Sequence, residues 1–271
     1  MSAGSGMKSW HWSGNAFEQA DSLPLTDRGF RYGMSLFESM RVWNGRIEFW
    51  QQHAQRLITA CAERDFPPTK NAINAAASVL ESAGVNGFAR VYVTAGDGGP
   101  TTPVTAPRVF LFIETREPEP EKSWEICFHD DPCRPIFSGL KTANYWFNTA
   151  ALTHARARRF DEALLSNDLG EVLSTCCANV FVVHGDRIAT PGRGSGCRMG
   201  IMREWVIKRR KVEERRLRRE DMLSADEIFL TNSWLGVMPV ATLEGRPLGP
   251  RSIGPKLAAE IERSREDSGA D

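Results

Sequence analysis

The chain is organised around one lysine, Lys141, in the stretch Ser138-Gly-Leu-Lys-Thr-Ala-Asn-Tyr145. A Pro-rich segment, Asp131-Pro-Cys-Arg-Pro-Ile-Phe137, precedes it, and residues 146–159 have the pattern of an amphipathic helix. A cation at the entrance to a helix is disfavoured by the helix dipole, so we expect a lowered pKa. The free amine is the nucleophile that a Schiff base requires. A lone lysine of this kind is usually a surface residue, so its assignment depends on the rest of the chain.

The support comes from the stretch that follows, Asp161-Glu-Ala-Leu-Leu-Ser-Asn-Asp-Leu-Gly-Glu-Val-Leu-Ser-Thr-Cys-Cys-Ala-Asn-Val-Phe-Val-Val183. With Lys141, Thr190-Pro191 and Gly200-Ile-Met-Arg203, it resembles the fold-type IV pyridoxal-phosphate enzymes, the class IV aminotransferase family. That family includes branched-chain and D-amino-acid aminotransferases and 4-amino-4-deoxychorismate lyase. The resemblance implies an α/β (α+β) fold of two domains, like that of D-amino-acid aminotransferase, with pyridoxal 5'-phosphate as the cofactor.

A linker divides the chain near its middle. Residues 115–122 read Thr-Arg-Glu-Pro-Glu-Pro-Glu-Lys, in which charges alternate with prolines. We therefore predict an N-terminal α/β domain at 8–115, a linker at 116–123 and a C-terminal cofactor-binding domain at 124–271.

Hydrophobic periodicity predicts an antiparallel sheet first and then alternating helices and strands. Asn44-Gly45 is a strong hairpin signal, residues 27–33 suit a turn, and the polar loop 95–107 suits a flexible lid or a partner contact. The charge-dense segment 208–221 mixes both signs, which favours a solvated face over a nucleic-acid site. The predicted strands are 35–43, 46–50, 87–94, 108–113, 124–128, 163–166, 180–183, 187–189 and 227–231, and the predicted helices begin at 51 and occupy 71–83, 146–159, 201–211 and 255–265.

Composition excludes several classes of protein. The 271 residues are 41% apolar and 25% charged with a formal net charge of zero, so no overall field attracts nucleic acid or an anionic membrane. No apolar run approaches the ~20 residues that cross a bilayer, and no signal peptide is recognisable, which predicts a cytoplasmic protein with free thiols. The six cysteines and five histidines show no metal-ligand spacing, so we predict no metal site and a small-molecule substrate.

The resemblance assigns roles to individual residues. Lys141 would bind the cofactor as a Schiff base and then move the substrate's alpha proton, which requires a neutral amine near pH 7. Arg56, in Gln52-His-Ala-Gln-Arg-Leu57, matches the arginine that holds the cofactor phosphate, and a guanidinium can bind two phosphate oxygens at once. The backbone amides of Gly200, Ile201 and Met202 would complete the phosphate site at a helix start.

Two further residues match family positions less specifically. Ser233, in Thr231-Asn-Ser-Trp-Leu-Gly-Val-Met-Pro-Val240, would reach the phosphate with its hydroxyl, although a turn serine is the plain alternative. Tyr145 would donate a hydrogen bond to the phenolic oxygen of the cofactor. The alternative interpretation, a tyrosine that only packs in the core, fits the sequence nearly as well. Asn179 and Thr190 suit structural roles that fix turns beside the cofactor.

The main departure from the family pattern is Ser174. The family has a glutamate there, four residues after Gly170, whose carboxylate keeps the pyridine nitrogen protonated. Glu171 lies three residues away, with the opposite parity if the segment is extended. A hydroxyl can donate to a neutral pyridine but cannot stabilise a pyridinium, so the electron sink is weaker. Transamination depends most on a protonated ring, and the serine therefore favours a lyase or a catalytically altered member.

Three functions stay open. Residues 175–179, 199–203 and 232–240 look most like 4-amino-4-deoxychorismate lyase, which makes 4-aminobenzoate and pyruvate for folate synthesis. An amino-acid transaminase of branched-chain or D-amino-acid type and a non-catalytic binding protein are the alternatives. The D-amino-acid enzymes carry an Arg-x-His carboxylate trap, and the loop Ala95-Gly-Asp-Gly-Gly-Pro100 has neither residue. Arg193, Arg198 or Arg41 would have to bind substrate carboxylates.

The resemblance also implies an assembly. Family members place the active site at a subunit contact, so we expect a two-fold homodimer in which loop 95–107 reaches the partner.

Overall fold

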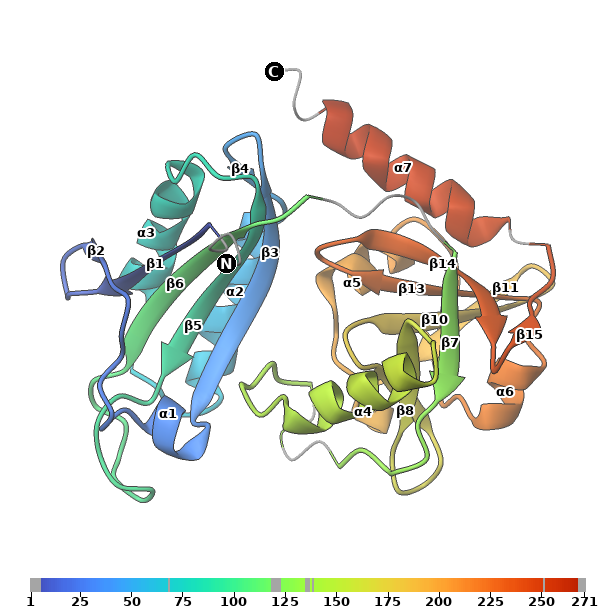
Figure 1. The fold of residues 1–271 in the computed structure, drawn as a ribbon, viewed down its shortest axis with the longest axis horizontal. Helices are drawn as coiled ribbons and strands as arrows, with labels where there is room; N and C mark the ends of the chain where they lie inside the picture. The colour runs from blue at the N-terminus through green and yellow to red at the C-terminus, as the bar shows by residue number, and fades with distance from the viewer. Residues whose placement is uncertain are drawn as a thin grey trace. The chain divides into compact units, whose positions relative to one another are not determined.

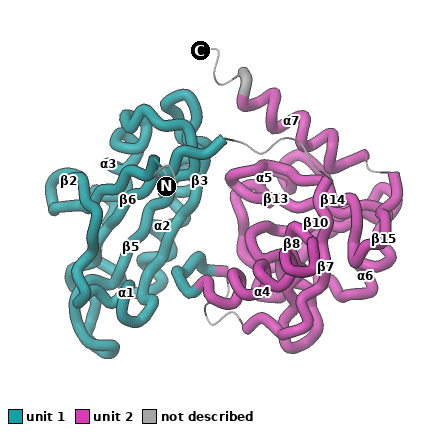
Figure 2. Tube along the Cα trace, in the orientation of Figure 1, with its two compact units in different colours: residues 1–118, 140–144 teal, residues 119–139, 145–271 magenta. Residues whose placement is uncertain are grey.

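A computed structural model describes residues 6–67, 69–117, 123–134, 137, 139–250 and 252–267, without the side chains of 266 and 267. The chain forms two compact units (Figure 2): Met1–Pro118 with Leu140–Asn144, called the first unit, and Glu119–Gly139 with Tyr145–Asp271, called the second unit. Most of the predicted linker, residues 118–122, lies outside the described residues. Each unit is described by itself.

The first unit is built on a six-stranded antiparallel sheet with the order β2-β1-β6-β5-β3-β4 (Figure 1). The predicted hairpin is present, because Asn44 and Gly45 both have positive φ, at 49° and 71°, as a two-residue turn of this kind requires. The elements are β1 Met7–Trp12, β2 Phe17–Gln19, α1 Arg28–Tyr32, β3 Ser35–Trp43, β4 Arg46–Ile47, α2 Trp50–Ala62, α3 Lys70–Glu81, β5 Gly87–Thr94 and β6 Arg108–Thr115.

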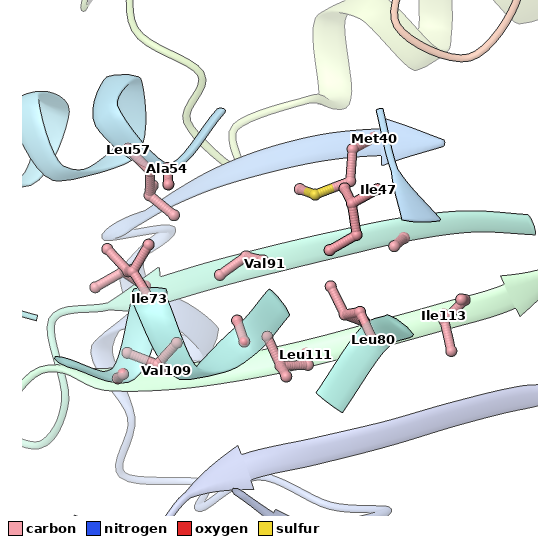
Figure 3. Packing of buried hydrophobic residues seen from close by; sticks show 14 of the residues in the cluster. Met40, Ile47, Ala54, Leu57, Ile73, Leu80, Val91, Val109, Leu111 and Ile113 are labelled. Atoms are coloured by element: carbon pink, nitrogen blue, oxygen red, sulfur yellow. The ribbon is translucent and has the colours of Figure 1, made fainter. Parts of the chain in front are cut away.

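The core of the first unit lies between one face of this sheet and helices α2 and α3. Alternate residues of each strand point to that face, so Met40, Val91 and Leu111 meet Leu57 and Leu80 of the helices (Figure 3). The opposite face carries an aromatic row. The rings of Phe37 and Tyr92 stack with centroids 4.9 Å apart, and Phe112 meets Tyr92 edge-on at 5.6 Å. Since α2 and α3 cover only one face, this second face is where function can be sought.

Residues 27–33 form a helix rather than the predicted turn. Asp27 caps α1 by accepting a hydrogen bond from the Gly29 amide at 2.7 Å. Arg28 is buried and donates to the carbonyl oxygens of Ala95, Gly96 and Thr102, and this anchors the loop 95–107. The predicted lid or partner-contacting loop is therefore held at these three residues, because a buried guanidinium needs acceptors.

The second unit contains a nine-stranded mixed sheet. Its order is β12-β11-β10-β13-β14-β7-β8-β9, with β15 paired to β14, and the pairs β11–β12, β14–β7 and β7–β8 are parallel. The elements are β7 Trp124–Phe128, α4 Trp146–Ala157, β8 Glu162–Ser166, β9 Val172–Thr175, β10 Asn179–His184, β11 Arg187–Pro191, a 3-10 turn Arg193–Ser195, α5 Ile201–Ile207, β12 Val212–Arg215, α6 Arg219–Leu223, β13 Glu227–Asn232, β14 Gly236–Leu243, β15 Arg246–Pro247 and α7 Ile253–Asp267.

The charge-dense segment 208–221 contains an unpredicted strand, β12. It pairs in parallel with β11, and its charges are matched by opposite ones: Arg215 meets Asp221 at 2.9 Å and Glu214 meets Arg203 at 2.6 Å. These ion pairs agree with the predicted solvated, mixed-sign surface.

The described residues hold no groups of three or more His, Cys, Asp or Glu side chains placed for a metal ion. No described helix combines the length and apolar character needed to cross a bilayer. All six cysteines are free thiols, and burial raises the pKa of Cys61 to about 11. The neighbouring cysteines Cys176 and Cys177 differ in exposure. Cys176 is buried and donates to the Ala163 carbonyl, while Cys177 is exposed.

Candidate active site

Lys141 lies against strand β3 of the first unit. The Phe37 amide donates to the Lys141 carbonyl at 2.9 Å, and Thr142 forms an isolated antiparallel bridge with Leu36. The Lys141 Nζ atom is 4.1 Å from the centroid of the Phe37 ring, on the face that α2 and α3 leave uncovered. The amine of the predicted catalytic lysine is thus held over an aromatic ring by a segment that pairs with the sheet.

The helix-dipole explanation for Lys141 is wrong. Helix α4 begins at Trp146 with Tyr145 as its N-cap, and the effect of a helix dipole is confined to about one turn. Lys141 is four residues before that cap, in an extended segment. Its amine lies over the face of the Phe37 ring and not at a helix terminus.

Arg56 donates hydrogen bonds to a glutamate, Glu38, that was not predicted from the sequence. Glu38 of β3 accepts hydrogen bonds from Arg56 Nε at 2.7 Å and from Arg56 Nη2 at 2.6 Å. His53, three residues earlier on the same face of α2, lies with Nδ1 2.8 Å from Glu38 Oε2. The signal was an acidic residue in a strand whose flanking core positions, Leu36 and Met40, are apolar.

Electrostatics keep this carboxylate ionised. Burial by itself would raise the pKa of Glu38, but the charge of Arg56 and the hydrogen bonds from His53 and Arg56 hold that pKa well below its usual range. Burial lowers the pKa of His53 more than Glu38 raises it. The ring is therefore neutral at pH 7 and donates from Nδ1, which leaves its buried Nε2 without a hydrogen-bond partner among the described residues.

Two predicted backbone sites, Gly200 and Ile201, lie at the start of α5 in the second unit. Gly200 is the N-cap, and its carbonyl accepts from the Glu204 amide at 2.9 Å. A Cβ atom on Gly200 would lie 2.1 Å from Asn179 Oδ1, so any larger residue here would have to displace the Asn179 side chain. Asn179 also donates to the Arg198 carbonyl at 2.7 Å and thereby fixes the loop before α5.

The other second-unit residues gather at the same sheet end. Thr190 donates to the Val180 carbonyl at 2.7 Å, and Asn179 pairs with Thr231 at the end of β13. Ser233 follows in the turn to β14, where the Asn232 side chain accepts from two turn amides. Ile201 and Met202 are buried through their side chains, and the amides of a first helical turn have no partner within the helix.

Tyr145 and Ser174 complete the predicted set. Tyr145 is half-buried, and its carbonyl accepts from the Thr149 amide and hydroxyl, both at 2.9 Å. Ser174 lies in β9 opposite Leu165 of β8. Glu171 precedes that strand, forms an ion pair with Arg216 at 3.2 Å and accepts a hydrogen bond from Asn167 at 3.0 Å. No carboxylate of β9 therefore takes the place of the family glutamate.

A second buried carboxyl, Glu162 of β8, was not singled out from the sequence. Burial raises its pKa to about 7, although hydrogen bonds from the Thr175 hydroxyl and from the amides of Cys176 and Cys177 act against that rise. The atom Glu162 Oε2 is buried without a hydrogen-bond partner among the described residues. Glu162 thus supports the turn that leads from Ser174 to Asn179, and a single proton decides its charge near neutral pH.

A cavity of about 600 Å³ opens on the aromatic face of the first unit. Its lining includes Trp10, Phe88, Tyr92 and Phe110 together with one arginine, Arg90, whose guanidinium lies 4.6 Å from the Phe88 centroid. Arg90 Nε is buried without a hydrogen-bond partner in the described part of the chain. The sequence reasoning passed over Arg90 because it sits inside a regular strand.

The other arginines considered for carboxylate binding are placed differently. Arg41 is buried against Trp43 and lies 3.4 Å from Glu48. Arg193 is exposed in the 3-10 turn, and Arg198 is half-buried. None of these three lines the cavity on the aromatic face.

Each unit by itself holds groups suited to part of a phosphorylated aldehyde. The first unit holds an amine and a guanidinium whose orientation is fixed by Glu38. The second unit holds a helix start at which a Cβ atom on Gly200 would lie against Asn179 Oδ1. An amine can bind an aldehyde, and a guanidinium or the amides of a first helical turn can bind a phosphate.

Known proteins resemble this chain along most of its length. The sequence model described as Amino-transferase class IV matches residues 35–243. Aminodeoxychorismate lyase of Vibrio harveyi is 28% identical over 240 residues, covering 81% of this chain and 86% of that protein. D-alanine aminotransferase of Bacillus licheniformis is 24% identical over 274 residues, covering 95% of each. The structure of the branched-chain aminotransferase of Thermoproteus uzoniensis superposes with a TM-score of 0.84 at 22% identity, covering 95% of this chain and 94% of that one. This likeness confirms the predicted fold class.

Proposed function

The chain belongs to the class IV aminotransferase family and is a pyridoxal-phosphate-dependent enzyme, and we propose that it is an aminodeoxychorismate lyase. In this proposal it converts 4-amino-4-deoxychorismate to 4-aminobenzoate and pyruvate for folate synthesis. One observation supports the choice of reaction: strand β9 carries Ser174 and no carboxylate where the resemblance expects a glutamate, and Glu171, three residues earlier, contacts Arg216 and Asn167. The similarity to the Vibrio harveyi lyase supports the same choice.

The proposal gives each residue of the site a task. When bound, the cofactor supplies an electron sink for the bond that breaks at the substrate's alpha carbon. Lys141 holds the cofactor and moves the alpha proton with its amine, the only catalytic group assigned. Arg56, the amides of Gly200, Ile201 and Met202, and the Ser233 hydroxyl hold the phosphate. Tyr145 donates to the phenolic oxygen.

Ser174 sets the charge of the ring. A serine hydroxyl donates a hydrogen bond to a neutral nitrogen but carries no charge to stabilise a protonated one. Transamination needs a protonated ring more than elimination does, because elimination releases its electron pair with the leaving group. A neutral partner at this position therefore favours the lyase over the transaminase.

We also propose Arg90 as the partner of a substrate carboxylate. The substrate is a ring compound bearing carboxylates, and the cavity combines aromatic rings with one arginine. A guanidinium binds a carboxylate with two parallel hydrogen bonds, which a buried Nε without a partner is suited to join. Arg90 takes this task in place of Arg41, Arg193 and Arg198.

The proposal includes a homodimer. Exposed apolar side chains gather in and before α1, namely Leu23, Leu25, Phe30 and Tyr32, and loop 95–107 is anchored beside them through Arg28. We place the second copy on this surface and the protein in the cytoplasm. Light scattering at micromolar concentration should give twice the chain mass, and a monomeric mass with activity retained would exclude the dimer.

The test compares two activities in one protein. The wild type should release pyruvate from aminodeoxychorismate and transfer amino groups slowly or not at all from glutamate, leucine or D-alanine. Ser174→Glu restores a carboxylate, and a charge-assisted hydrogen bond of ~1.5 to 3 kcal/mol corresponds to roughly one to two decades in rate. The ratio of transamination to elimination should rise by that factor, with Lys141→Ala as the inactive control.

The opposite result identifies a different enzyme. If the wild type already transaminates at ordinary rates and Ser174→Glu leaves the ratio unchanged, then Ser174 does not select the reaction. The chain would then be an amino-acid transaminase of branched-chain or D-amino-acid type.

A further inference from the structure

Glu38 is an isolated charge in an apolar row. Its neighbours on the same face of β3 are Leu36 and Met40, both buried, and Glu38 itself is 2% exposed. A buried carboxylate is costly unless cations and hydrogen bonds surround it. Apolar residues would serve the core at least as well at this position, so the glutamate needs a reason other than packing.

The contacts of Glu38 are all directed at one helix. Arg56 donates twice, from Nε and Nη2, and this fork fixes both the position and the plane of the guanidinium. His53 approaches the same carboxylate at 2.8 Å from one turn earlier on α2. The Arg56 side chain is 25% exposed, while that of Glu38 is enclosed. The fork therefore holds the guanidinium of a partly exposed arginine in one fixed orientation.

We propose that Glu38 is a positioning residue that presets Arg56 for the cofactor phosphate, and that His53 holds Glu38 in place. The inference rests on the proposed role of Arg56 as a phosphate ligand and not on the choice between lyase and transaminase. Presetting matters because an arginine side chain otherwise loses rotamer freedom when it binds. The Glu38 fork removes that freedom before the cofactor arrives.

The same strand also locates the amine. Phe37, the residue before Glu38, lies under Lys141 Nζ and donates its amide to the Lys141 carbonyl. Adjacent residues of β3 therefore locate both cations that the resemblance assigns to the cofactor, the Lys141 amine through Phe37 and the Arg56 guanidinium through Glu38. Because successive residues of a strand point to opposite faces, a change at Glu38 can be separated from a change at Phe37.

The experiment measures cofactor binding without substrate. Dissociation constants of pyridoxal phosphate and of pyridoxal, which lacks the phosphate, are determined for the wild type and for Glu38→Gln by absorbance titration. Glu38→Gln should raise the dissociation constant of pyridoxal phosphate by roughly ten- to one hundred-fold and leave that of pyridoxal nearly unchanged. Glu48→Gln, which removes a carboxylate from Arg41 in the same sheet, is the matched control and should change neither.

A double-mutant cycle separates positioning from general damage. Arg56→Ala should also weaken binding of pyridoxal phosphate, and in that background Glu38→Gln should change the constant by no more than about two-fold. If Glu38→Gln fails to fold by near-UV circular dichroism, His53 provides the test. His53→Asn keeps a donor at the Nδ1 position and should preserve phosphate selectivity, and His53→Leu should lose it.

Three results would overturn the inference. Equal losses for pyridoxal phosphate and pyridoxal would mean that Glu38 only supports the fold. An unchanged constant in Glu38→Gln or in Arg56→Ala would mean that the fork does not serve the phosphate. A full additional loss on adding Glu38→Gln to Arg56→Ala would place its effect elsewhere. Since no substrate is used, the lyase proposal can fail while this one stands, and the reverse.

Discussion

Glu38 in the first unit and Glu162 in the second are both buried carboxyls on a strand, yet their pKa values move in opposite directions. Glu38 is 2% exposed and Glu162 5%, so both lose most of their hydration. Glu38 is met by the Arg56 cation and by His53, and its pKa falls. Burial dominates at Glu162, whose hydrogen bonds come from neutral groups, the Thr175 hydroxyl, the amides of Cys176 and Cys177 and the Cys176 thiol, and its pKa rises to about 7.

This difference shows how each unit fixes its own candidate site residues. Burial raises the pKa of either carboxyl, and at Glu38 the charge of Arg56 with the hydrogen bonds from His53 and Arg56 outweighs it. In the first unit, ionised groups fix one another's positions. In the second unit, Asn179, Thr190 and Gly200 do the same work with neutral hydrogen bonds and close backbone contacts. The arrangement around Glu38 should resist changes of pH around neutrality, and the arrangement around Glu162 should not.

The largest effect is expected from removing the cation. Arg56→Ala leaves Glu38 buried and unpaired, and we expect a loss of about 3 kcal/mol in the free energy of unfolding at pH 7, near the low end for a broken buried pair because Arg56 is partly exposed. Urea unfolding measures this with the cofactor removed from both proteins. Adding Glu38→Gln should restore most of the stability. A loss under about 1 kcal/mol would mean that the pair is not buried as described.

The same variant should reverse a pH dependence. In the wild type the low pKa of Glu38 contributes stability above the unfolded carboxyl value of 4.5, and this contribution is lost as the pH falls through the folded pKa. In Arg56→Ala the uncompensated burial raises the pKa of Glu38, so the variant should become relatively more stable as the pH falls from 7 to 5.

Glu162 should provide the next largest effect, with the opposite sign. Its pKa is about 7 in the folded chain against an ordinary value of 4.5, so the protonated form stabilises the fold. That contribution is complete below pH 4.5 and is lost as the pH rises through about 7, with a size of at most about 3 kcal/mol. Glu162→Gln should flatten this part of the stability curve. Glu125→Gln, at an exposed position of β7, is the control, and a curve that Glu162→Gln leaves unchanged would contradict the shift.

The smallest loss of stability is expected from a change at Gly200 in the second unit. Gly200→Ala places a Cβ atom against Asn179 Oδ1 and should cost ~1 to 3 kcal/mol in stability together with weaker cofactor binding. Gly194→Ala is the matched control, because no atom lies within 4 Å of its Cβ position. Thermal unfolding and cofactor titration provide the measurements. Equal effects of the two substitutions would show that Asn179 moves aside.

Much of the fold could be predicted from periodicity. Strands β3 and β5 were predicted with their observed bounds, because alternate apolar residues face one core. Strand β12 was missed, since Val212–Arg215 is three-quarters charged and becomes a strand only by pairing with β11. Helix α1 was missed because its glycines suggest a turn, whereas the Asp27 cap and the burial of Arg28 stabilise a helix.

Only those candidate site residues that match a family motif could be predicted from the sequence. The positions of Lys141 and Arg56 were read from motifs, and their roles stay predictions. Glu38 and Arg90 were not found, because a single charge inside a strand has no meaning until the partner helix or the opposite face is known. The dipole argument for Lys141 failed because sequence proximity to a helix does not place a residue in its first turn.

The short segment Leu140–Asn144 has a practical consequence for dissecting the protein. It belongs to the first unit through its bridge to β3, while the residues on both sides of it belong to the second. A fragment that ends near residue 118 therefore lacks Lys141, although Lys141 belongs to the first unit. Recombinant fragments ending there would lack the amine, and a peptide spanning the missing segment, supplied in trans, would be the means to restore it. The two units are each compact, but their segments alternate along the sequence. A deletion within residues 139–145 therefore affects both units.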